Sequence, residues 1–531
     1  RAAGMLSDQP LIRCNLGDAW LALGRHREAI APYREAVRLA PDLIRAVSAL
    51  GHALVESGQP EEAMALLERA VAAEPEVAEH WFRLGLARQR LWQHAAALQA
   101  FERCIAADDT RNDLLSAILF SLHYMPEVEQ ATIADWSRRF GQRMLRDVTP
   151  CTAHANDPDP ERCLCIGYLS GDFREHAVLH FVRPLLRHHD RGAFEVHCFS
   201  TCEAADAFTD EARGLADVWH AAWHMSDDEL ADHVRGLGID LLIDLSGHCQ
   251  HQRLGVLARK PAPVQITWLG YFDTTGLPTV DWIIADAILI PPAEEHWYTE
   301  KPLRLPHGHL CLDPMIEPIA VTPPPASVDG HVTFGCFNNL AKINPDVIAL
   351  WAQILHRLPH ARLLLKNGML NDAATVDRMR CAFENAGVAA ERLLLEGSSP
   401  RRAYYAAYAR VDIALDPFPY CGGTTTLQAL WMGVPVLTLA GTQGMIRRFG
   451  ESILSTVGLD DWIARDADAY VDKALRFAAD LPALARLRAE LRQRMMNSPA
   501  GDGARFTRSL ERALRGVWQQ WCRQRTGAPH R

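Results

Sequence analysis

A short loop rich in glycine and threonine carries the clearest chemical signal in this sequence of 531 residues. It follows the strand-like run 411–415 and reads DPFPYCGGTTT over residues 416–426. The two glycines allow a ligand to approach the backbone closely. The three threonines open a predicted helix whose first N–H groups lack intrahelical partners. The loop therefore predicts a cradle for a diphosphate. An ordinary helix cap after a tight turn is the alternative, although one threonine would be enough for that.

Other common ligand-binding motifs find no support in the sequence. No G-x-G-x-x-G follows a first strand and no G-x-x-x-x-G-K-[ST] appears, which disfavours dinucleotide and P-loop sites. No D-x-D motif stands out, which agrees with chemistry that uses no metal. The 13 cysteines are scattered, and the C-x-C pair Cys163 and Cys165 suits no common zinc site because no matching Cys/His pair follows. We expect no bound metal and reduced thiols, as in the cytoplasm.

The loop belongs to the second of two series in which strand-like apolar runs alternate with helical stretches. The first series follows a polar, proline-rich linker at 149–160. Its strands are predicted at 164–169, 194–199, 241–245, 264–269 and 282–284, with helices at 178–188 and 226–237. A connector rich in proline and small residues, 316–330, separates the two series. The alternation predicts parallel sheets with right-handed crossovers.

The second series has the same organisation. Its strands are predicted at 332–336, 362–366, 393–395, 411–415 and 435–439, its helices at 345–357, 375–386, 401–409 and 426–432, with helix from there to about residue 521. Two doubly wound, Rossmann-like domains, 161–315 and 331–531, would form a ligand cleft at the carboxyl ends of their strands. This is the two-lobed arrangement of B-type glycosyltransferases, although periodicity alone equally allows a two-domain dehydrogenase.

A repeat of 34 residues organises the first part of the chain. Leu-Gly pairs recur at 16–17, 50–51 and 84–85, and the same shift relates Gly24 to Gly58. This pattern is typical of tetratricopeptide repeats, in which pairs of helices stack into a solenoid with a concave, peptide-binding surface. We assign residues 1–148 to three such repeats and linking helices. A scaffold without a ligand of its own is the alternative to partner binding.

Composition and charge exclude several functional classes. The formal net charge of −10 argues against nucleic acid as the main partner. No run of eighteen apolar residues appears and no apolar signal segment follows the first residues, so we expect neither a membrane span nor a secretory signal. With 48% hydrophobic and 23% charged residues, the sequence predicts a soluble, cytoplasmic protein of several globular domains.

Four motifs together resemble the protein O-N-acetylglucosaminyltransferases and the related plant Spindly proteins, in a bacterial-type form. They are GYLSGDFREH at 167–176, PAPVQITWLGY at 261–271, CFNNLAK at 336–342 and the loop 416–430. The resemblance covers almost the whole chain, repeats included. It implies an inverting transfer of N-acetylglucosamine from UDP-N-acetylglucosamine to a Ser or Thr hydroxyl of a protein, with no cofactor and no metal. The implied partners are a UDP-sugar and a peptide or protein held along the repeats.

That reaction must stabilise the leaving diphosphate and remove a proton from the attacking hydroxyl. By resemblance, Lys342 is the lysine that contacts phosphate. His176 matches the active-site histidine of the family and follows the first strand, and an imidazole suits a general base. Asp172 could orient it or relay the proton, and His123 corresponds to a histidine that faces the site in animal members. A relay through water or phosphate stays open, and His180 is interpreted as a cleft or packing residue.

The resemblance places recognition of the nucleotide in the second domain. Gly423, Thr424 and Thr425, together with the adjacent Thr426, occupy the part of the loop that contacts the diphosphate. Gln428 stands where animal members use an aspartate to bind the ribose, and an amide can also bond a hydroxyl.

The residues expected around the base lie earlier in the second domain. Tyr404 stands where animal members stack a histidine on uracil, and an aromatic ring would keep that stacking, with core packing as the alternative. Ser398, Ser399 and Arg401 fall in the base-binding loop. Asn339 replaces a glutamine of the animal members.

These departures leave a second donor open. The motif at 337–342, the Phe-Pro-Tyr run at 418–420 and the three threonines resemble the Spindly branch at least as closely, and that branch transfers fucose from GDP-fucose. A repeat-containing adaptor with inactive lobes and a two-domain oxidoreductase are the remaining alternatives. The sequence contains Lys342, His176 and the threonine loop together. An inactive lobe would not need all three, which argues against the adaptor.

Overall fold

The structure is a computed structural model that describes residues 9–314 and 319–526. The two ends of the chain, the last residue of the predicted domain 161–315 and the first residues of the predicted connector 316–330 lie outside the described residues. The chain divides into two compact units. Unit 1 comprises Arg1–Glu127 and Phe337–Pro400, and unit 2 comprises Val128–Cys336 and Arg401–Arg531.

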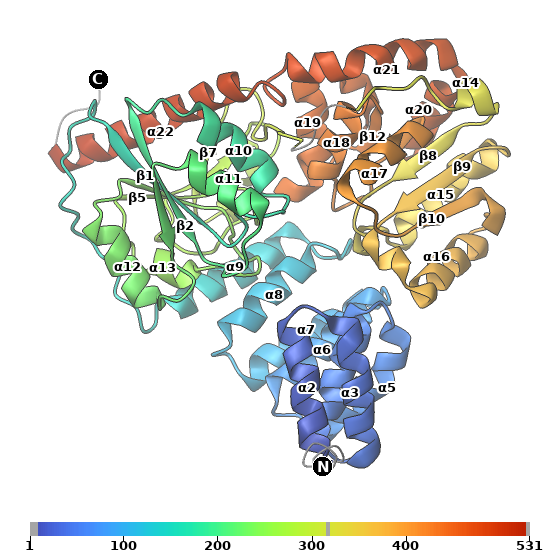
Figure 1. The fold of residues 1–531 in the computed structure, drawn as a ribbon, viewed down its shortest axis with the longest axis horizontal. Coiled ribbons are helices and arrows are strands. Elements are labelled where there is room, and N and C mark those ends of the chain that lie inside the picture. The colour runs from blue at the N-terminus through green and yellow to red at the C-terminus, as the bar shows by residue number, and fades with distance from the viewer. Residues whose placement is uncertain (1–8, 315–318, 527–531) are drawn as a thin grey trace. The chain divides into compact units, whose positions relative to one another are not determined.

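Paired helices build the first part of unit 1, coloured blue in Figure 1. They are α2 (Pro10–Ala22), α3 (His26–Leu39), α4 (Ile44–Glu56), α5 (Pro60–Ala73), α6 (Ala78–Arg90) and α7 (His94–Ala107), followed by α8 (Asn112–Leu122). The first six form three pairs at the predicted period of 34 residues. The structure confirms the tetratricopeptide repeats, and α8 continues them within the region predicted to hold linking helices.

The repeated glycines have a steric reason in each pair. A Cβ atom placed on Gly17 would lie 2.6 Å from the ring of Tyr33, and one on Gly85 would lie 2.3 Å from the ring of Phe101. The middle repeat has the same contact with a leucine. Only a residue without a side chain lets the large residue of the second helix reach the backbone of the first, as the sequence pattern predicts.

The rest of unit 1 alternates short helices with two strands. Its elements are η2 (Leu340–Lys342), α15 (Pro345–Arg357), β9 (Arg362–Lys366), η3 (Gly368–Asn371), α16 (Ala373–Asn385), η4 (Ala390–Arg392) and β10 (Leu393–Glu396). The region of α16 is bonded to the repeats. Arg378 donates to the carbonyl oxygen of Gly58 at 2.7 Å, and Arg27 pairs with Asp372 at 3.0 Å. These contacts explain why residues far apart in the sequence form one compact unit.

A sheet of seven parallel strands forms the first lobe of unit 2 (Figure 1). Its order is β3-β2-β1-β4-β5-β6-β7, with bounds β1 (Leu164–Ser170), β2 (Phe194–Ser200), β3 (Val218–Ala221), β4 (Leu241–Asp244), β5 (Val264–Thr267), β6 (Trp282–Ala285) and β7 (Lys301–Arg304). The residues from β1 and β2 pair from Leu164 with Phe194 to Ser170 with Ser200. The carboxyl ends of β1 and β2 therefore lie at one edge of the sheet.

Helices surround this sheet and complete its core. They are α9 (Gln130–Met144), α10 (Leu179–His188), α11 (Ala207–Leu215), α12 (Asp227–Gly236), α13 (Leu254–Ala258), η1 (Pro292–Trp297) and, from the end of the chain, α22 (Gly503–Thr526). The buried side chains of Phe506, Leu510 and Trp518 on α22 join the same apolar cluster as the strands. The basic stretch at 505–525 is thus one amphipathic helix whose apolar face packs on the first lobe.

The second sheet has six strands in the order β10-β9-β8-β11-β12-β13. The strands of this sheet that belong to unit 2 are β8 (Thr333–Cys336), β11 (Ile413–Leu415), β12 (Val436–Leu439) and β13 (Ile463–Ala464). The remaining elements are α14 (Ala326–Asp329), α17 (Arg401–Ala406), η5 (Ala407–Arg410), α18 (Thr424–Trp431), η6 (Met445–Arg448), α19 (Phe449–Val457), η7 (Asp460–Trp462), α20 (Ala467–Ala479) and α21 (Leu481–Met496). Two parallel, Rossmann-like sheets after helical repeats confirm the predicted fold class.

Three strands were not predicted from the sequence, and the prediction is wrong at those points. β3 and β7 are the edge strands of the first sheet and read VWHA and KPLR, so their partly exposed side chains show neither an apolar run nor a clear alternation. β13 has only two residues and interrupts the stretch that was predicted to be helical to residue 521. Within 9–314 and 319–526, no helix is long and apolar enough to cross a membrane.

Candidate active site

The loop after β1 holds the predicted base and its neighbour. Asp172 is buried at 4% exposure, whereas the side chain of His176 is 42% exposed. The imidazole Nδ1 lies 3.4 Å from the nearer carboxylate oxygen of Asp172 and 3.3 Å from the backbone N–H of Val178. The structure thus brings His176 and Asp172 together at the carboxyl edge of the first sheet.

Three influences set the pKa of His176. Partial burial lowers it most, the carboxylate of Asp172 raises it, and the guanidinium of Arg174 lowers it again. The net direction is below the usual value of 6.5. The imidazole is therefore neutral at physiological pH, which is the protonation state that a general base needs.

An ion pair links this loop to the start of α17. Arg401 pairs with Glu175, the residue before His176, at 2.6 Å, and its guanidinium lies 4.2 Å from the ring centre of Phe208. The resemblance predicts that Arg401 lies in a base-binding loop. In the structure its guanidinium holds the His176 loop beside the helix that carries Tyr404.

The predicted diphosphate loop is shaped by a buried aspartate. One carboxylate oxygen of Asp416 accepts from the backbone N–H of Gly422 at 2.7 Å, and the other accepts from the hydroxyl of Thr438 at 2.8 Å. Asp416 is 1% exposed and its own carbonyl oxygen accepts from the hydroxyl of Tyr470 at 3.2 Å. The turn between β11 and α18 is therefore fixed from beneath, a role that the sequence analysis did not assign to Asp416.

The start of α18 offers donors and space to a ligand. Gly423 is the N-cap residue of the helix and has no side chain that could cap it. A Cβ atom on Gly422 would lie 2.7 Å from the hydroxyl of Thr425 and 2.6 Å from that of Thr426. The Thr426 hydroxyl is buried and has no hydrogen-bond partner among the described residues. The arrangement has the properties of an anion site, because backbone N–H groups, hydroxyls and the helix dipole converge on a space that glycine keeps open.

Motifs of the two lobes meet beside this loop within unit 2. The ring of Phe272, directly after the motif 261–271, packs edge-on against the ring of Tyr420 at 4.7 Å between centres. The thiol of Cys421, the next residue of the loop, donates to the carbonyl oxygen of Arg447 at 3.2 Å. Arg448 forms a buried ion pair with Glu294 of the first lobe. Neither Phe272 nor Glu294 was singled out from the sequence, although Phe272 adjoins a recognised motif.

Gln428 and its neighbours form a hydrogen-bonded chain. The hydroxyl of Tyr404 donates to the amide oxygen of Gln428, and the amide nitrogen of Gln428 donates to the hydroxyl of Tyr405, each at 3.1 Å. Gln428 is 7% exposed. The ring of Tyr404 also packs edge-on against Tyr405 and Tyr408. The structure thus brings together Tyr404 and Gln428, which the resemblance assigned to the base and to the ribose.

The other predicted site residues belong to unit 1. The ammonium of Lys342 lies at the end of η2 and donates to the side-chain oxygen of Asn338 at 3.2 Å. The side chain of Asn339 accepts from the backbone N–H of Ala341 at 3.0 Å and so begins η2. His123 is the residue that follows α8 and is 3% exposed.

Ser398 and Ser399 follow β10 and differ in the hydrogen bonding of their hydroxyls. Asn371 donates to the hydroxyl of Ser398 at 2.6 Å and accepts from its backbone N–H at 3.0 Å. The hydroxyl of Ser399 is buried without a hydrogen-bond partner among the described residues. A buried hydroxyl in that state is costly unless a ligand or water completes it.

Comparison with known proteins decides the family. Residues 146–315 and 326–510 match the family described as Glycosyl transferase family 41, and residues 21–87 match a tetratricopeptide repeat. The chain belongs to glycosyl transferase family 41. The family 41 match includes the His176 loop, the CFNNLAK motif and the threonine loop, and the repeat match lies in the blue helices of Figure 1.

Relatives in family 41 come from plants, animals and bacteria. A tomato (Solanum lycopersicum) protein named "Probable UDP-N-acetylglucosamine--peptide N-acetylglucosaminyltransferase SPINDLY" is 38% identical over 78% of this chain and 45% of its own length. The Caenorhabditis elegans UDP-N-acetylglucosamine--peptide N-acetylglucosaminyltransferase is 23% identical over 69% of this chain and 41% of its own length. The chain spans about half the length of the curated relatives it matches.

A solved family 41 structure covers nearly the whole fold. A mutant of the Thermobaculum terrenum O-GlcNAc transferase is 38% identical, superposes with a TM-score of 0.87, and is matched over 97% of this chain and 98% of its own. The agreement includes the repeats and both sheets. The suspected kinship with the protein O-N-acetylglucosaminyltransferases and Spindly proteins is therefore confirmed, and a two-domain oxidoreductase is excluded as the class of this chain.

Proposed function

We propose that this chain is an inverting glycosyltransferase that moves N-acetylglucosamine from UDP-N-acetylglucosamine to Ser or Thr hydroxyls of a protein acceptor. The observation that carries the proposal is the threonine cradle at the start of α18 in a family 41 chain. The helix N-terminus, the hydroxyls of Thr425 and Thr426 and the space kept by Gly422 suit the diphosphate of a nucleotide sugar.

The chemical step needs charge stabilisation and a base. Departure of the nucleotide builds negative charge on the diphosphate, which the donors of Gly423, Thr424, Thr425 and Thr426 and the ammonium of Lys342 would stabilise. Neutral His176 would accept the proton of the attacking hydroxyl on its unprotonated ring nitrogen, with Asp172 favouring the imidazolium that forms. In this mechanism a fixed ammonium supplies the positive charge that a metal ion supplies in other transferases, so we propose transfer without metal or cofactor.

The nucleotide base and ribose would be recognised by the tyrosine and amide chain of unit 2. Tyr404 offers a ring face for stacking, and Gln428 offers an amide that the ribose hydroxyls could share with Tyr405. Ser399 supplies a hydroxyl whose bonding the described residues leave incomplete. We assign these residues, together with Asn339 and Arg401, to donor binding.

The sequence identities to relatives support a second candidate donor. The chain is 38% identical to the tomato SPINDLY protein but 29% identical to the Arabidopsis thaliana protein named SEC. Sequence motifs pointed to the same branch, for which the resemblance implies GDP-fucose. Protein O-fucosylation is therefore the second candidate function, with the same cradle and the same base.

Calorimetric titration with UDP, GDP and NAD in turn separates the alternatives. UDP, GDP and NAD all carry a diphosphate, so only the base pocket can distinguish them. We expect UDP to bind and GDP and NAD not to bind. Binding of GDP alone would favour fucose transfer. Binding of none would leave the inactive adaptor as the better account and would contradict the proposed function.

The acceptor would be held by the third repeat. A cavity within unit 1 is lined by Trp92 and Tyr124 of the helical repeats and by Leu340, Met369 and Arg378 of the segment 337–400. Trp92 has a φ of +57°, which non-glycine residues seldom adopt. Gly24 and Gly58 occupy the same position of the first two repeats with φ of +69° and +87°. A strained tryptophan in place of the repeat glycine suggests selection for its indole in the cavity.

Trp92→Gly tests this assignment of the acceptor site. Glycine adopts the required φ without strain, so the apparent Tm should stay the same or rise. Loss of the indole should raise KM for an acceptor peptide several-fold. The exposed Trp223 in unit 2 offers a control, and Trp223→Ala should leave KM unchanged. An unaltered acceptor KM in a folded Trp92→Gly protein would remove Trp92 from the acceptor site.

A further inference from the structure

Three side chains suited to a transition metal meet on one face of β1 and β2. Cys165 and Glu195 are paired residues on the two parallel strands, and His197 lies two residues beyond Glu195, so all three project to the same side. The thiol Sγ is 3.8 Å from the carboxylate Oε2, and the imidazole Nε2 is 3.4 Å from Oε1. One ligand atom from each residue lies within 4.8 Å of the other two.

We propose that Cys165, Glu195 and His197 bind a zinc ion, with an exogenous fourth ligand such as water. Bond lengths of about 2.3 Å to sulfur and about 2.0–2.2 Å to nitrogen and oxygen at tetrahedral angles place ligand atoms roughly 3.6 Å and 3.3 Å apart. The observed S–O separation ends on Oε2 of Glu195 and the N–O separation on Oε1, so a rotation of the carboxylate brings one oxygen towards both values. A thiolate, an imidazole and one carboxylate together favour zinc over magnesium or calcium, which prefer all-oxygen sites.

The histidine provides an independent observation. His197 is 5% exposed, and its Nε2 is buried without a hydrogen-bond partner among the described residues, although it faces the carboxylate of Glu195. A buried polar atom in that state is expected to have a missing ligand. A His–Glu hydrogen bond, in which Nε2 donates to the carboxylate at 3.4 Å, is the rival account, and it predicts no metal binding.

Two further histidines orient the proposed ligand. Nδ1 of His197 lies 3.1 Å from Nε2 of His220, and Nδ1 of His220 lies 3.1 Å from Nε2 of His233. A neutral imidazole donates from one ring nitrogen and accepts at the other, so the two hydrogen bonds of His220 can run in one direction along the chain. A chain in which His197 donates to His220 and His220 to His233 leaves Nε2 of His197 with its lone pair directed at Glu195 and Cys165. This is the tautomer that binds a metal.

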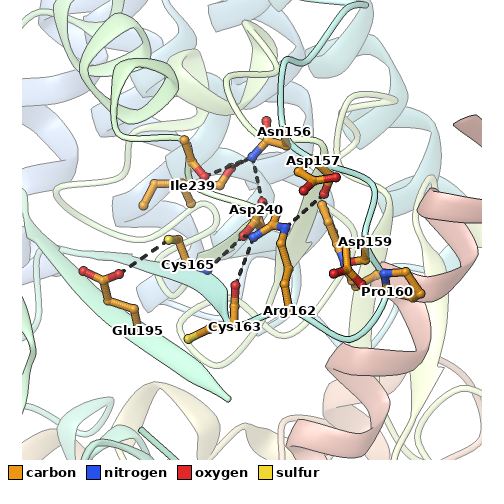
Figure 2. Close-up of polar contacts among 12 residues, drawn as sticks. Asn156, Asp157, Asp159, Pro160, Arg162, Cys163, Cys165, Glu195, Ile239 and Asp240 are labelled. Carbon is orange, nitrogen blue, oxygen red and sulfur yellow. Dashed lines mark hydrogen bonds and ion pairs between the residues drawn. The ribbon is translucent and has the colours of Figure 1, made fainter. Parts of the chain in front are cut away.

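The strand that carries the thiol is held in place by a buried ion pair. Figure 2 shows the Cys165 thiol directed towards Glu195, while the backbone N–H of Cys165 donates to a carboxylate oxygen of Asp240 at 2.9 Å. Arg162 donates to the same carboxylate, and Asn156 donates to it at 2.7 Å. Ligands on rigid strands lose little freedom on binding, which favours a preformed site. The side chain of Glu195 is 50% exposed, so an ion can enter from solvent.

The proposed zinc site is separate from the transfer site. Cys165 is the second residue of β1, whereas Asp172 and His176 follow the carboxyl end of that strand. Five residues of strand separate Cys165 from Ser170, which corresponds to about 16 Å. A zinc ion there would stabilise the amino edge of the first sheet and would take no part in sugar transfer.

Titration of the complete, untagged and chelator-stripped protein with zinc sulfate alone, and separately with cobalt chloride, tests the proposal. We expect one equivalent of zinc to bind and to raise the apparent Tm, because a ligand that binds only the folded state stabilises it. One equivalent of cobalt should give a thiolate-to-cobalt charge-transfer band and intense visible bands of a tetrahedral ion. A wild-type protein without the thiolate band would overturn the proposal whatever the variants do.

Variants then assign the ligands. Cys165→Ser and His197→Gln should each weaken zinc binding by at least tenfold and abolish the charge-transfer band or shift it, and Glu195→Gln should weaken binding similarly. His220→Asn should weaken it by roughly 10–100-fold through the orientation of His197. The exposed residues Cys381 and His224 provide controls, and Cys381→Ser and His224→Gln should bind as the wild type does. A thiolate band that persists in Cys165→Ser would contradict the assignment.

Discussion

At the scale of single residues, the two halves of the proposed chemistry rest on different kinds of contact. His176 depends on a carboxylate and a nearby guanidinium of its own loop, and both adjust its pKa. The loop at 416–426 depends on Asp416, which is buried and fixes the turn through two hydrogen bonds. The candidate reacting groups were named from the sequence through the resemblance of their motifs to a known family. The sequence did not predict Asp416, because a buried carboxylate that bonds backbone has no signature of its own in a single sequence.

The pH dependence of transfer follows from the pair His176 and Asp172. A base is active when neutral, so kcat/KM should rise with pH through the pKa of His176, which lies below 6.5. The Asp172 carboxylate stabilises the imidazolium and raises that pKa. Its removal in Asp172→Asn should therefore lower the pKa and move the acid limb to lower pH, as measured from pH–rate profiles.

Two controls make this profile specific. His176→Gln should lose the acid limb together with most of the activity, and Asp210→Asn, which alters an exposed carboxylate of α11, should keep the wild-type limb. An acid limb that moves to higher pH in Asp172→Asn would refute the assigned roles of both residues.

Lys342 carries the sharpest prediction on rate. Replacement by alanine removes the ammonium that we assign to the leaving diphosphate, and loss of one such stabilising group typically costs about 10²–10³-fold in kcat. The expected result for Lys342→Ala is a rate lower by about that factor with an unchanged melting curve. Lys301→Ala, at an exposed lysine of β7, serves as the control. Wild-type turnover in Lys342→Ala would end its role in the mechanism.

At the scale of elements, helix and strand bounds could be predicted where the sequence pattern is long or where a residue such as proline marks the start of an element. Helix α15 (Pro345–Arg357) and strand β9 (Arg362–Lys366) have the predicted bounds, because a proline starts the helix and three leucines fill the strand. Strands β3 and β7 were missed because edge strands of four mixed residues carry no apolar run. Their pairing with a neighbour, and not their own sequence, makes them strands.

Close packing of α9 on the loop after β5 gives a prediction about stability. A Cβ atom on Gly141 would lie 1.7 Å from the carbonyl oxygen of Gly276, which is backbone and cannot rotate away. We expect Gly141→Ala to destabilise unit 2 by about 1–3 kcal/mol, the usual cost of overpacking, and to lower the apparent Tm.

A second glycine serves as the matched control. Gly516 lies within α22 with nothing within 4 Å of its would-be Cβ, so Gly516→Ala should stabilise the helix by up to roughly 1 kcal/mol. Thermal unfolding of the two variants side by side measures the contrast. Equal Tm values for Gly141→Ala and the wild type would show that the helix and the loop pack less tightly than the structure indicates.

At the scale of the whole molecule, contiguous patterns predicted the fold class but not the grouping of its parts. The predicted domains 1–148, 161–315 and 331–531 follow changes in periodicity along the chain. The compact units instead join the repeats to Phe337–Pro400, and contacts such as that of Arg378 with Gly58 account for this. The proposed site residues accordingly divide between units, with His176 and the threonine loop in unit 2 and Lys342, Ser399 and His123 in unit 1.

The zinc proposal illustrates the same limit at this scale. Spacing along the chain argued against a zinc site at Cys163 and Cys165, because no second pair follows. Parallel pairing of β1 with β2 brings Glu195 and His197 beside Cys165 from about thirty residues away. Only the register of the sheet, which single-sequence patterns do not fix, reveals that cluster.

The most direct test of the central claim is transfer itself. The wild-type protein is incubated with a peptide mixture rich in Ser and Thr and with either UDP-N-acetylglucosamine or GDP-fucose, in a buffer that contains EDTA. Mass spectrometry identifies the sugar on the peptides, and the released nucleotide is quantified. The account predicts N-acetylhexosamine on Ser or Thr with one UDP released for each sugar transferred. Deoxyhexose from GDP-fucose alone, or no transfer from either donor, would contradict it.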